Sequence, residues 1–274
     1  MTSPAPRRNR VCRRGVVTRT ERITPHMIRV VLTSDDFVDN GFTDHYVKLL
    51  FLKPGVEYPE PLDMGVVRET FPAEQWPTMR TYTVRSWDED TRELTIDFVY
   101  HGDEGVAGPW AAAAQPGDVL WFNGPGGAYA PAEAADWHLL VGDESALPAI
   151  GAAVEQLPAG AYATVLVEVE DASEEQKLGD FDVTWFHRAG SDAARGDALV
   201  AAVEALTFPP GTPHIFVHGE AGFVFRIRKN LFQDRALPRD QVSVSGYWRL
   251  GKNEDGWQAE KAETNRKERE AAGS

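Results

Sequence analysis

The stretch that decides the fold is Arg80–Arg85, which reads Arg-Thr-Tyr-Thr-Val-Arg. β-Branched and aromatic residues dominate it, which is typical of a strand whose two faces differ. A second β-prone run, Leu94–Tyr100, follows shortly after, and Gly105–Ala111 then reads as a glycine- and alanine-rich turn that opens a short helix. Two such strands and such a turn can together hold one large, flat, doubly phosphorylated ligand.

A flavin dinucleotide has that shape. The ring of Tyr82 can stack on the isoalloxazine, the threonine hydroxyls beside it can bond the ring edge, and Arg80 can meet a phosphate. Backbone N–H groups of the turn 105–108, at a helix N-terminus, can take the pyrophosphate. The sequence therefore predicts an FAD site on this pair of strands.

Further candidates for the flavin site lie on the second strand and the helix. Asp97, Val99 and His101 share one face because the side-chain period of a strand is two. His101 either contacts the flavin or caps the turn at Gly102, and Trp110 either covers the cofactor or packs between barrel and helix. The predicted flavin residues are Arg80, Thr81, Tyr82, Thr83, Asp97, Val99, His101, Gly105, Val106, Ala107, Gly108 and Trp110.

The first half of the chain reads as a closed antiparallel barrel, because short β-prone runs are separated by Gly and Pro. Residues 56–78 are rich in proline and lack periodicity, so we expect a long loop that acts as a lid or a ligand wall. The six candidate strands are 16–17, 27–32, 46–52, 80–86, 94–100 and 119–122.

Beyond a linker at 130–136 the pattern changes to alternating strands and helices, which indicates a parallel sheet with helices on both faces. The expected fold class is β + α/β: an N-terminal six-stranded antiparallel β-barrel flavin domain, then a parallel-sheet nucleotide-binding-like α/β domain. The expected boundaries are 10–132, 136–252 and a charged helical tail at 253–274, which is either solvated or a lid. The expected strands are 138–142, 163–169, 182–186, 214–217 and 241–247, with helices at 146–157, 198–206 and 222–232.

Composition excludes several classes of function. The net charge of −14 over 274 residues argues against nucleic acid as a partner. Cys12 is the only cysteine, which excludes an intrachain disulfide and thiolate-bound metal clusters. His214 and His218 sit on one expected strand, too far apart for a shared ion, so no metal site is predicted. No apolar run is long enough to insert in a membrane, and we expect a cytoplasmic protein.

The second nucleotide site should follow the strand that ends at Val141. No G-x-G-x-x-G is present, and the acids Asp143 and Glu144 disfavour direct phosphate contact. We therefore expect Ser145 and Ala146 near the nicotinamide and the flavin rather than on a pyrophosphate, and we count Asp143 as a further cofactor-binding candidate. Glu168 and Glu170, at the end of the next strand, can bond ribose hydroxyls and repel a 2′-phosphate, which favours NADH over NADPH, whereas Arg188 could reverse that preference.

Two segments, Val141–Ile150 and Ser245–Gly251, resemble signatures of the siderophore-interacting protein family, and the likeness extends from about residue 14 to residue 257. A barrel with the flavin motif followed by a nucleotide-type domain is also the layout of ferredoxin-reductase-like flavoproteins. The family includes NAD(P)H-dependent ferric-siderophore reductases. The resemblance implies FAD against Tyr82, with Thr83 near its reactive edge. The family often has Ser at the position of Gly108, so a hydroxyl donor is missing here.

The resemblance also implies the substrate and the chemistry. NADH or NADPH would reduce the flavin, and the flavin would reduce Fe(III) in a ferric siderophore, so that no residue serves as a nucleophile. Ferric siderophores are often anionic, and the cationic candidates for binding one are Lys48, Arg249, Lys252 and Lys261. Two alternatives stay open: a reductase that takes its electrons from ferredoxin or another protein, and a siderophore-binding or flavin-storage protein without turnover.

Overall fold

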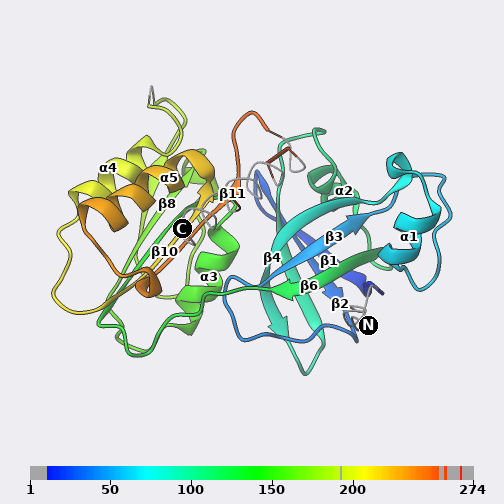
Figure 1. Ribbon diagram of the computed structural model, residues 1–274, viewed down its shortest axis with the longest axis horizontal. Coiled ribbons are helices and arrows are strands. Elements are labelled where there is room, and N and C mark those ends of the chain that lie inside the picture. Colours follow the sequence, from blue (N-terminus) through cyan, green and yellow to red (C-terminus); the bar gives the residue numbers. More distant parts are fainter. Residues whose placement is uncertain (1–10, 192, 253–255, 258–265, 267–274) are drawn as a thin grey trace, which may run out of the picture. The chain divides into compact units, whose positions relative to one another are not determined.

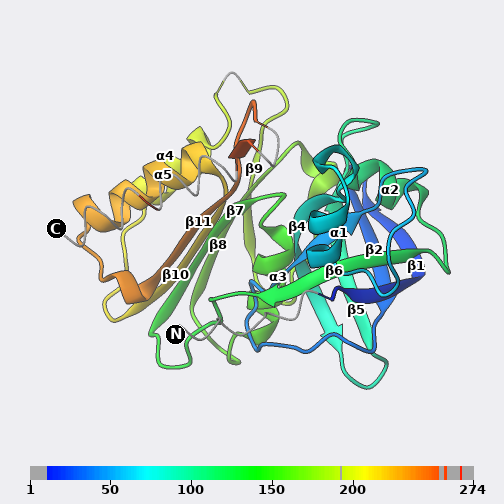
Figure 2. The ribbon, with the colours of Figure 1, turned by 45° about the vertical axis from the view of Figure 1, so that its right-hand side comes forward.

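The computed structural model describes residues 11–191, 193–252, 256–257 and 266. The chain divides into two compact units, one ending at Ala128 and the other beginning at Tyr129. Figure 1 and Figure 2 show the elements of both.

The first unit is a closed barrel, which confirms the predicted fold. Its strands pair in the order β1-β2-β5-β4-β3-β6, and every pairing is antiparallel. Residues at alternate positions fill the interior, and Val30, Leu49 and Phe98 are fully buried there. The strands are β1 (Arg13–Thr24), β2 (Met27–Thr33), β3 (Tyr46–Phe51), β4 (Thr78–Asp88), β5 (Glu93–Val99) and β6 (Val119–Gly126).

The prediction of an irregular loop over 56–78 is wrong in part, because this stretch holds the helix α1 (Met64–Thr70) and a 3₁₀ turn at Ala73–Gln75. The Asp63 carboxylate caps α1 and accepts from the backbone N–H of Gly65 at 2.7 Å. Val67 is fully buried in a small cluster that also contains Leu62. The helix is too short to show a helical period in the sequence.

The helix α2 (Ala107–Ala113) lies between β5 and β6, as the glycine-rich turn predicts. Ala107 and Ala111 are buried in the barrel core. Packing of this face holds the start of the helix against the end of β5, where the predicted phosphate turn lies.

The second unit is a five-stranded parallel sheet in the order β11-β10-β7-β8-β9, again as predicted. Its strands are β7 (Trp137–Asp143), β8 (Ala163–Val169), β9 (Val183–His187), β10 (Pro213–Glu220) and β11 (Val242–Trp248). The helices are α3 (Leu147–Gln156), α4 (Asp197–Ala205) and α5 (Ala221–Lys229), and α5 runs into a π-helical turn at Asn230–Asp234.

Helices cover both faces of this sheet, because alternate residues of each central strand belong to different cores. On β7, Leu139 and Val141 pack in the cluster of α4 and α5, while Leu140 packs in the cluster of α3. Figure 1 shows α4 and α5 together on one face and α3 on the other. The result is a rigid sheet whose strands all end along one edge.

The charged tail predicted over 253–274 lies outside the described residues, apart from Gly256, Trp257 and Arg266. Among the helices that the structure describes, none has the length and apolar character needed to cross a membrane.

Candidate functional site

The pairing of β3 with β4 brings three predicted site residues to one side of the barrel. Lys48 lies directly opposite Thr81, and Tyr46 lies directly opposite Thr83. Residues that face each other across two strands point to the same side of the sheet. We call these four residues, Tyr46, Lys48, Thr81 and Thr83, the barrel face. Thr81 and Lys48 are exposed, and Thr83 is buried.

Tyr82 and Trp110 contact the barrel core. The Tyr82 ring lies 4.5 Å from the ring of Phe98, centroid to centroid, and it stays half-buried. Trp110 lies 5.7 Å from both Phe51 and Phe98. Trp110 thus packs on the barrel core and is half-buried, and its contact with the cofactor stays a prediction.

Arg80 is half-buried and its charge is not neutralised. Its Nη1 donates to the Met79 carbonyl oxygen at 2.7 Å. Among the residues described, no carboxylate lies within ion-pair distance of its guanidinium. A guanidinium with remaining donors and no acidic partner is suited to a phosphate.

The start of α2 also suits a phosphate. No side chain caps this helix, so the N–H groups of Ala107 and Gly108 are available to an acceptor. A Cβ added to Gly108 would lie 3.3 Å from the Val99 carbonyl oxygen, so the absent side chain lets the helix start approach β5 closely. Gly105, with φ of +80°, turns the chain into this position. These donors, like Arg80, are of the kind that binds a phosphate group of FAD.

Asp97 is buried and bonded to a partner that the sequence analysis did not identify. Arg29 faces it from β2 and donates from Nε at 2.7 Å and from Nη2 at 2.8 Å. Both carboxylate oxygens are therefore engaged in joining β2 to β5. Opposite charges at paired strand positions could have indicated the pair once the register was known. Val99 is half-buried at the end of β5, and His101 is exposed just beyond it.

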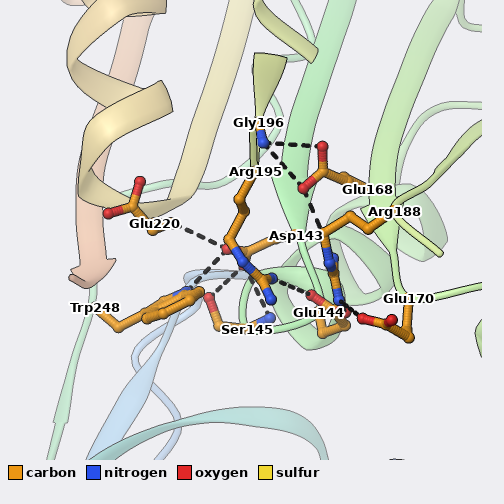
Figure 3. Close-up of polar contacts among 10 residues, drawn as sticks. All are labelled: Asp143, Glu144, Ser145, Glu168, Glu170, Arg188, Arg195, Gly196, Glu220 and Trp248. Carbon is orange, nitrogen blue, oxygen red and sulfur yellow. Dashed lines mark hydrogen bonds and ion pairs between the residues drawn. The ribbon is translucent and has the colours of Figure 1, made fainter. Parts of the chain in front are cut away.

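In the second unit, Asp143 joins three strand ends (Figure 3). Its Oδ1 accepts from the N–H and the hydroxyl of Ser145 at 3.0 and 2.6 Å. Its Oδ2 accepts from the Glu220 N–H at 2.9 Å and from Trp248 Nε1 at 2.8 Å. The side chain is fully buried, and burial, with the nearby charge of Glu144, raises its pKa. Asp143 thus positions Ser145 at the end of β7, while Ala146 is fully buried.

Glu220 extends this arrangement to the loop after β11. Its Oε2 accepts from Gly222 N–H at 2.6 Å and so caps α5, and its Oε1 accepts from Leu250 N–H at 3.2 Å. The predicted siderophore residues Arg249 and Lys252 lie in this loop, joined by a bond from Lys252 N–H to the Arg249 carbonyl at 3.1 Å. Lys261, the fourth candidate, lies outside the described residues.

Charged side chains also gather where β7, β8 and β9 end (Figure 3). Arg188 pairs with Glu144, Glu168 and Glu170, and Arg195, which the sequence analysis did not single out, pairs with Glu144. We call this set of Asp143, Glu144, Glu168, Glu170, Arg188 and Arg195 the carboxyl edge.

Burial has opposite consequences for the two kinds of charge at this edge. It raises the pKa of Glu168, although bonds from the Gly196 N–H and the charge of Arg188 act against that shift. Burial alone would lower the pKa of Arg188, but the hydrogen bond and charge of Glu144 outweigh it and raise that pKa. Arg188 is therefore cationic at neutral pH.

The two histidines considered as metal ligands lie on β10, as the strand prediction requires. His214 stacks on Tyr129 at 4.7 Å and accepts from the Ala132 N–H, and His218 bonds the Ser243 hydroxyl at 3.0 Å. Across the described ranges, no three His, Cys, Asp or Glu side chains gather in a way that could hold a metal ion.

A closed antiparallel barrel followed by a parallel nucleotide-type sheet defines the class of ferredoxin-reductase-like flavoproteins. Residues 16–129 match the family model of a siderophore-interacting FAD-binding domain, and residues 135–251 match that of a siderophore-interacting protein. The chain belongs to the siderophore-interacting protein family.

Relatives with established names share most of the chain. The ferric vibriobactin reductase of Vibrio cholerae is 33% identical, with 89% of this chain and 91% of that protein covered. An NADPH-dependent ferric-chelate reductase of Escherichia coli is also 33% identical, with 85% and 91% covered. The crystal structure of a siderophore utilization protein from T. fusca has a TM-score of 0.75 and 38% identity, with 88% and 94% covered.

Proposed function

We propose that this chain is a flavin-dependent reductase of ferric siderophores that takes its electrons from a pyridine nucleotide. The observation that carries the proposal is the barrel face, where the cationic Lys48 lies directly across from Thr81 of the flavin motif. A docked anionic chelate and a flavin on Thr81 and Thr83 would then be neighbours. The names of the Vibrio and Escherichia relatives support the same reaction class.

The residues of the barrel would hold FAD in a fixed orientation. Arg80 and the first N–H groups of α2 bind the pyrophosphate, because these donors have no competing acidic partner among the described residues. Thr81 and Thr83 would bond the ring edge from the barrel face, and Tyr82, which alternates with them along β4 and packs on Phe98, would hold the strand beneath them. FAD, when bound, supplies a group that accepts two electrons at once and donates them singly to Fe(III).

Asp97, Val99 and His101 would complete this site from β5. The bidentate pair of Asp97 with Arg29 holds β5 and so positions the two residues that follow. Val99 lies at the strand end, and the exposed His101 follows it at the turn formed by Gly102, where it would contact the edge of the ligand.

In the second unit, the end of β7 would receive the nicotinamide. Asp143 fixes the Ser145 hydroxyl and N–H, and the buried Ala146 keeps the turn narrow. The Escherichia relative is named for NADPH, which supports a pyridine nucleotide as donor. Ferredoxin, the predicted alternative donor, has no support in the names of these two relatives.

Lys48 in the first unit, and Arg249 and Lys252 in the second, are the cations that would attract the ferric siderophore, with Lys261 as a further candidate. Cationic groups of this kind offset the protein's net charge of −14, which would otherwise repel an anionic chelate. Fe(II) binds hard oxygen ligands less tightly than Fe(III) and is released. We place this reaction in the cytoplasm, where released Fe(II) can be used.

Anaerobic absorbance spectroscopy of the FAD-loaded protein tests the proposal. NADH or NADPH should bleach the flavin band, and a ferric siderophore should restore it, with about two Fe(II) trapped by a ferrous chelator for each nucleotide oxidised, because a hydride carries two electrons. The same siderophore loaded with redox-inert Ga(III) should bind without restoring the band. A bleached flavin that ferric siderophore leaves unchanged would reject the function.

A further inference from the structure

Arg188 directly follows β9 and lies on the carboxyl edge. Its side chain is only 14% exposed. Nη2 is shared between the carboxylates of Glu144 and Glu170, at 3.1 Å from the latter, and Nη1 lies 3.7 Å from Glu168. Nε and Nη1 are buried and donate no hydrogen bond. The guanidinium is therefore surrounded by carboxylates before any ligand arrives (Figure 3).

Glu144 is held by a second arginine as well. Arg195 Nη1 lies 3.7 Å from the Glu144 oxygen that Arg188 does not bond, and its guanidinium lies over the Trp248 ring at 5.1 Å. Two guanidinium groups thus converge on one carboxylate, an arrangement in which an anion bridges two cations. Glu144 therefore already neutralises part of the charge of both arginines.

The topology places this cluster where the adenosine of a dinucleotide is expected. The chain runs from the central β7 to β8 and β9 on one side and then crosses to β10 and β11 on the other. In such sheets a dinucleotide lies outside the carboxyl ends of the strands where the order reverses, and an acid after the second strand bonds the ribose hydroxyls. β8 is that second strand, and Glu168 and Glu170 lie at its end.

The two acids at the end of β8 differ in what they can do. Glu168 is 3% exposed, and its oxygens accept from the Gly196 N–H at 2.9 and 3.0 Å, so it holds the start of α4. Glu170 is 45% exposed and offers a carboxylate to solvent. An approaching nucleotide would therefore meet Glu170 before it could reach Arg188.

We propose that Glu144 and Glu170 hold Arg188 as a selectivity device that disfavours the 2′-phosphate of NADPH, so that the chain takes NADH in preference. This inference rests on the pyridine nucleotide of the proposed function. Because Nε and Nη1 of Arg188 are buried, a 2′-phosphate would have to approach Nη2 and displace a carboxylate that then remains beside it. A 2′-hydroxyl can donate to Glu170 without separating any pair. The preference would be opposite to the donor in the name of the Escherichia relative.

Binding of ADP-ribose and 2′-phospho-ADP-ribose to the FAD-loaded protein, measured by calorimetry, tests the device. Neither ligand carries a nicotinamide, so the result is independent of flavin and iron chemistry. We expect the wild type to bind ADP-ribose about ten-fold tighter, equivalent to about 1.4 kcal/mol. The double variant Glu144→Gln/Glu170→Gln should bind the phosphorylated ligand at least about ten-fold tighter than the wild type does and change ADP-ribose affinity by less than about three-fold.

Matched variants show whether Arg188 is responsible. Adding Arg188→Leu to the double variant should abolish its gain in affinity for 2′-phospho-ADP-ribose. Glu175→Gln, which removes a carboxylate that pairs with His187 instead, should leave both affinities unchanged. Should the double variant fail to fold, Glu170→Gln alone changes only a half-exposed side chain and should give a smaller gain of the same sign.

Three results would overturn the inference: equal or tighter binding of the phosphorylated ligand by the wild type, a gain that persists without Arg188, or no binding of either ligand. A failure of the proposed function would look different. Chemically reduced protein would then fail to reduce ferric siderophore, while the two ADP-ribose affinities could still differ as expected.

Discussion

The barrel and the carboxyl edge both carry cations suited to anionic ligands, but these cations are unpaired in the barrel and paired at the edge. Among the described residues no carboxylate pairs with Arg80 or Lys48 in the barrel, whereas Arg188 and Arg195 on the sheet are already paired with glutamates. An unpaired cation adds its full attraction to a phosphate or chelate. A paired cation adds only the difference between the new partner and the old one. Unpaired cations therefore increase the affinity for any anionic ligand, whereas paired cations favour one ligand over another.

The largest expected effect is on stability, and it comes from removing the Asp143 carboxylate that joins three strand ends of the second unit. Asp143→Ala leaves buried donors of Ser145, Glu220 and Trp248 without an acceptor, and the free energy of unfolding should fall by about 3 kcal/mol. Urea denaturation measures the loss. Asp143→Asn, which keeps the shape and one acceptor oxygen, should lie between the wild type and Asp143→Ala. A loss under about 1 kcal/mol for alanine would show that these bonds do not hold the edge.

The next largest effect is on FAD affinity. It compares two arginines of the barrel: Arg80, which has no acidic partner among the described residues, and Arg19, which pairs with Glu93. Arg80→Ala should weaken FAD binding about ten- to hundred-fold, because a charge-assisted bond to phosphate contributes about 1.5–3 kcal/mol. Fluorescence titration of the apoprotein with FAD measures the affinity. Arg19, which pairs with Glu93 at the surface, is the matched control, and Arg19→Ala should leave FAD affinity unchanged. Equal losses of FAD affinity in the two variants would show that Arg80 contributes no more to FAD binding than a paired surface arginine does.

A pH effect of about 1 kcal/mol is expected from the start of the sheet, at the opposite end from the carboxyl edge. His138 and His214 face each other across β7 and β10. Burial lowers the pKa of both, and the charge of His214 lowers that of His138 further. As pH falls below the unfolded value of about 6.5, the unfolded chain binds protons first, so the folded state loses stability.

Stability measured from pH 7 to pH 5 checks this linkage. His138→Gln should flatten the decline below about pH 6.5, since it removes one of the two titrating groups. The exposed His26 in the barrel is the control, and His26→Gln should keep the wild-type slope. An unchanged slope for His138→Gln would mean that its burial does not disfavour the charged form.

The smallest effect should come from the exposed lysine of the barrel face. Lys48→Met should weaken binding of an anionic ferric siderophore about two- to five-fold at low salt, and the difference should shrink as salt is added. Fluorescence quenching of the FAD-loaded protein measures this affinity. Lys53, whose Nζ donates to the Thr78 hydroxyl, is the matched control, and Lys53→Met should leave siderophore affinity unchanged. A siderophore affinity that does not change with Lys48→Met would remove it from the substrate site.

The elements of the fold could be predicted because burial leaves a periodic pattern in the sequence. The apolar run Ile215–Val217 is buried on both faces and therefore reads as a central strand. α1 was missed because one capped turn with a single fully buried side chain, Val67, leaves no period to detect. Short elements between prolines depend on caps and local packing, which composition does not reveal.

Partners of the site residues were harder to predict than the residues themselves. The sequence analysis placed Asp97 and Asp143 at cofactor sites, and the structure shows their oxygens already bonded to Arg29 and Trp248. These partners lie 68 and 105 residues away along the chain. Which side chains meet depends on strand register and crossover connections, and neither is encoded by a local motif.

The bond between Asp143 and Trp248 has a consequence for synthesis on the ribosome. The barrel closes with β6, which ends at Gly126, so the first unit has all its strands before the second has begun. The indole of Trp248, which donates to Asp143, is synthesised 105 residues after Asp143. At about 5–20 residues per second, that interval lasts about 5–20 s. A nascent chain can therefore contain every strand of the barrel well before the residues that complete the hydrogen bonds of Asp143 have been made.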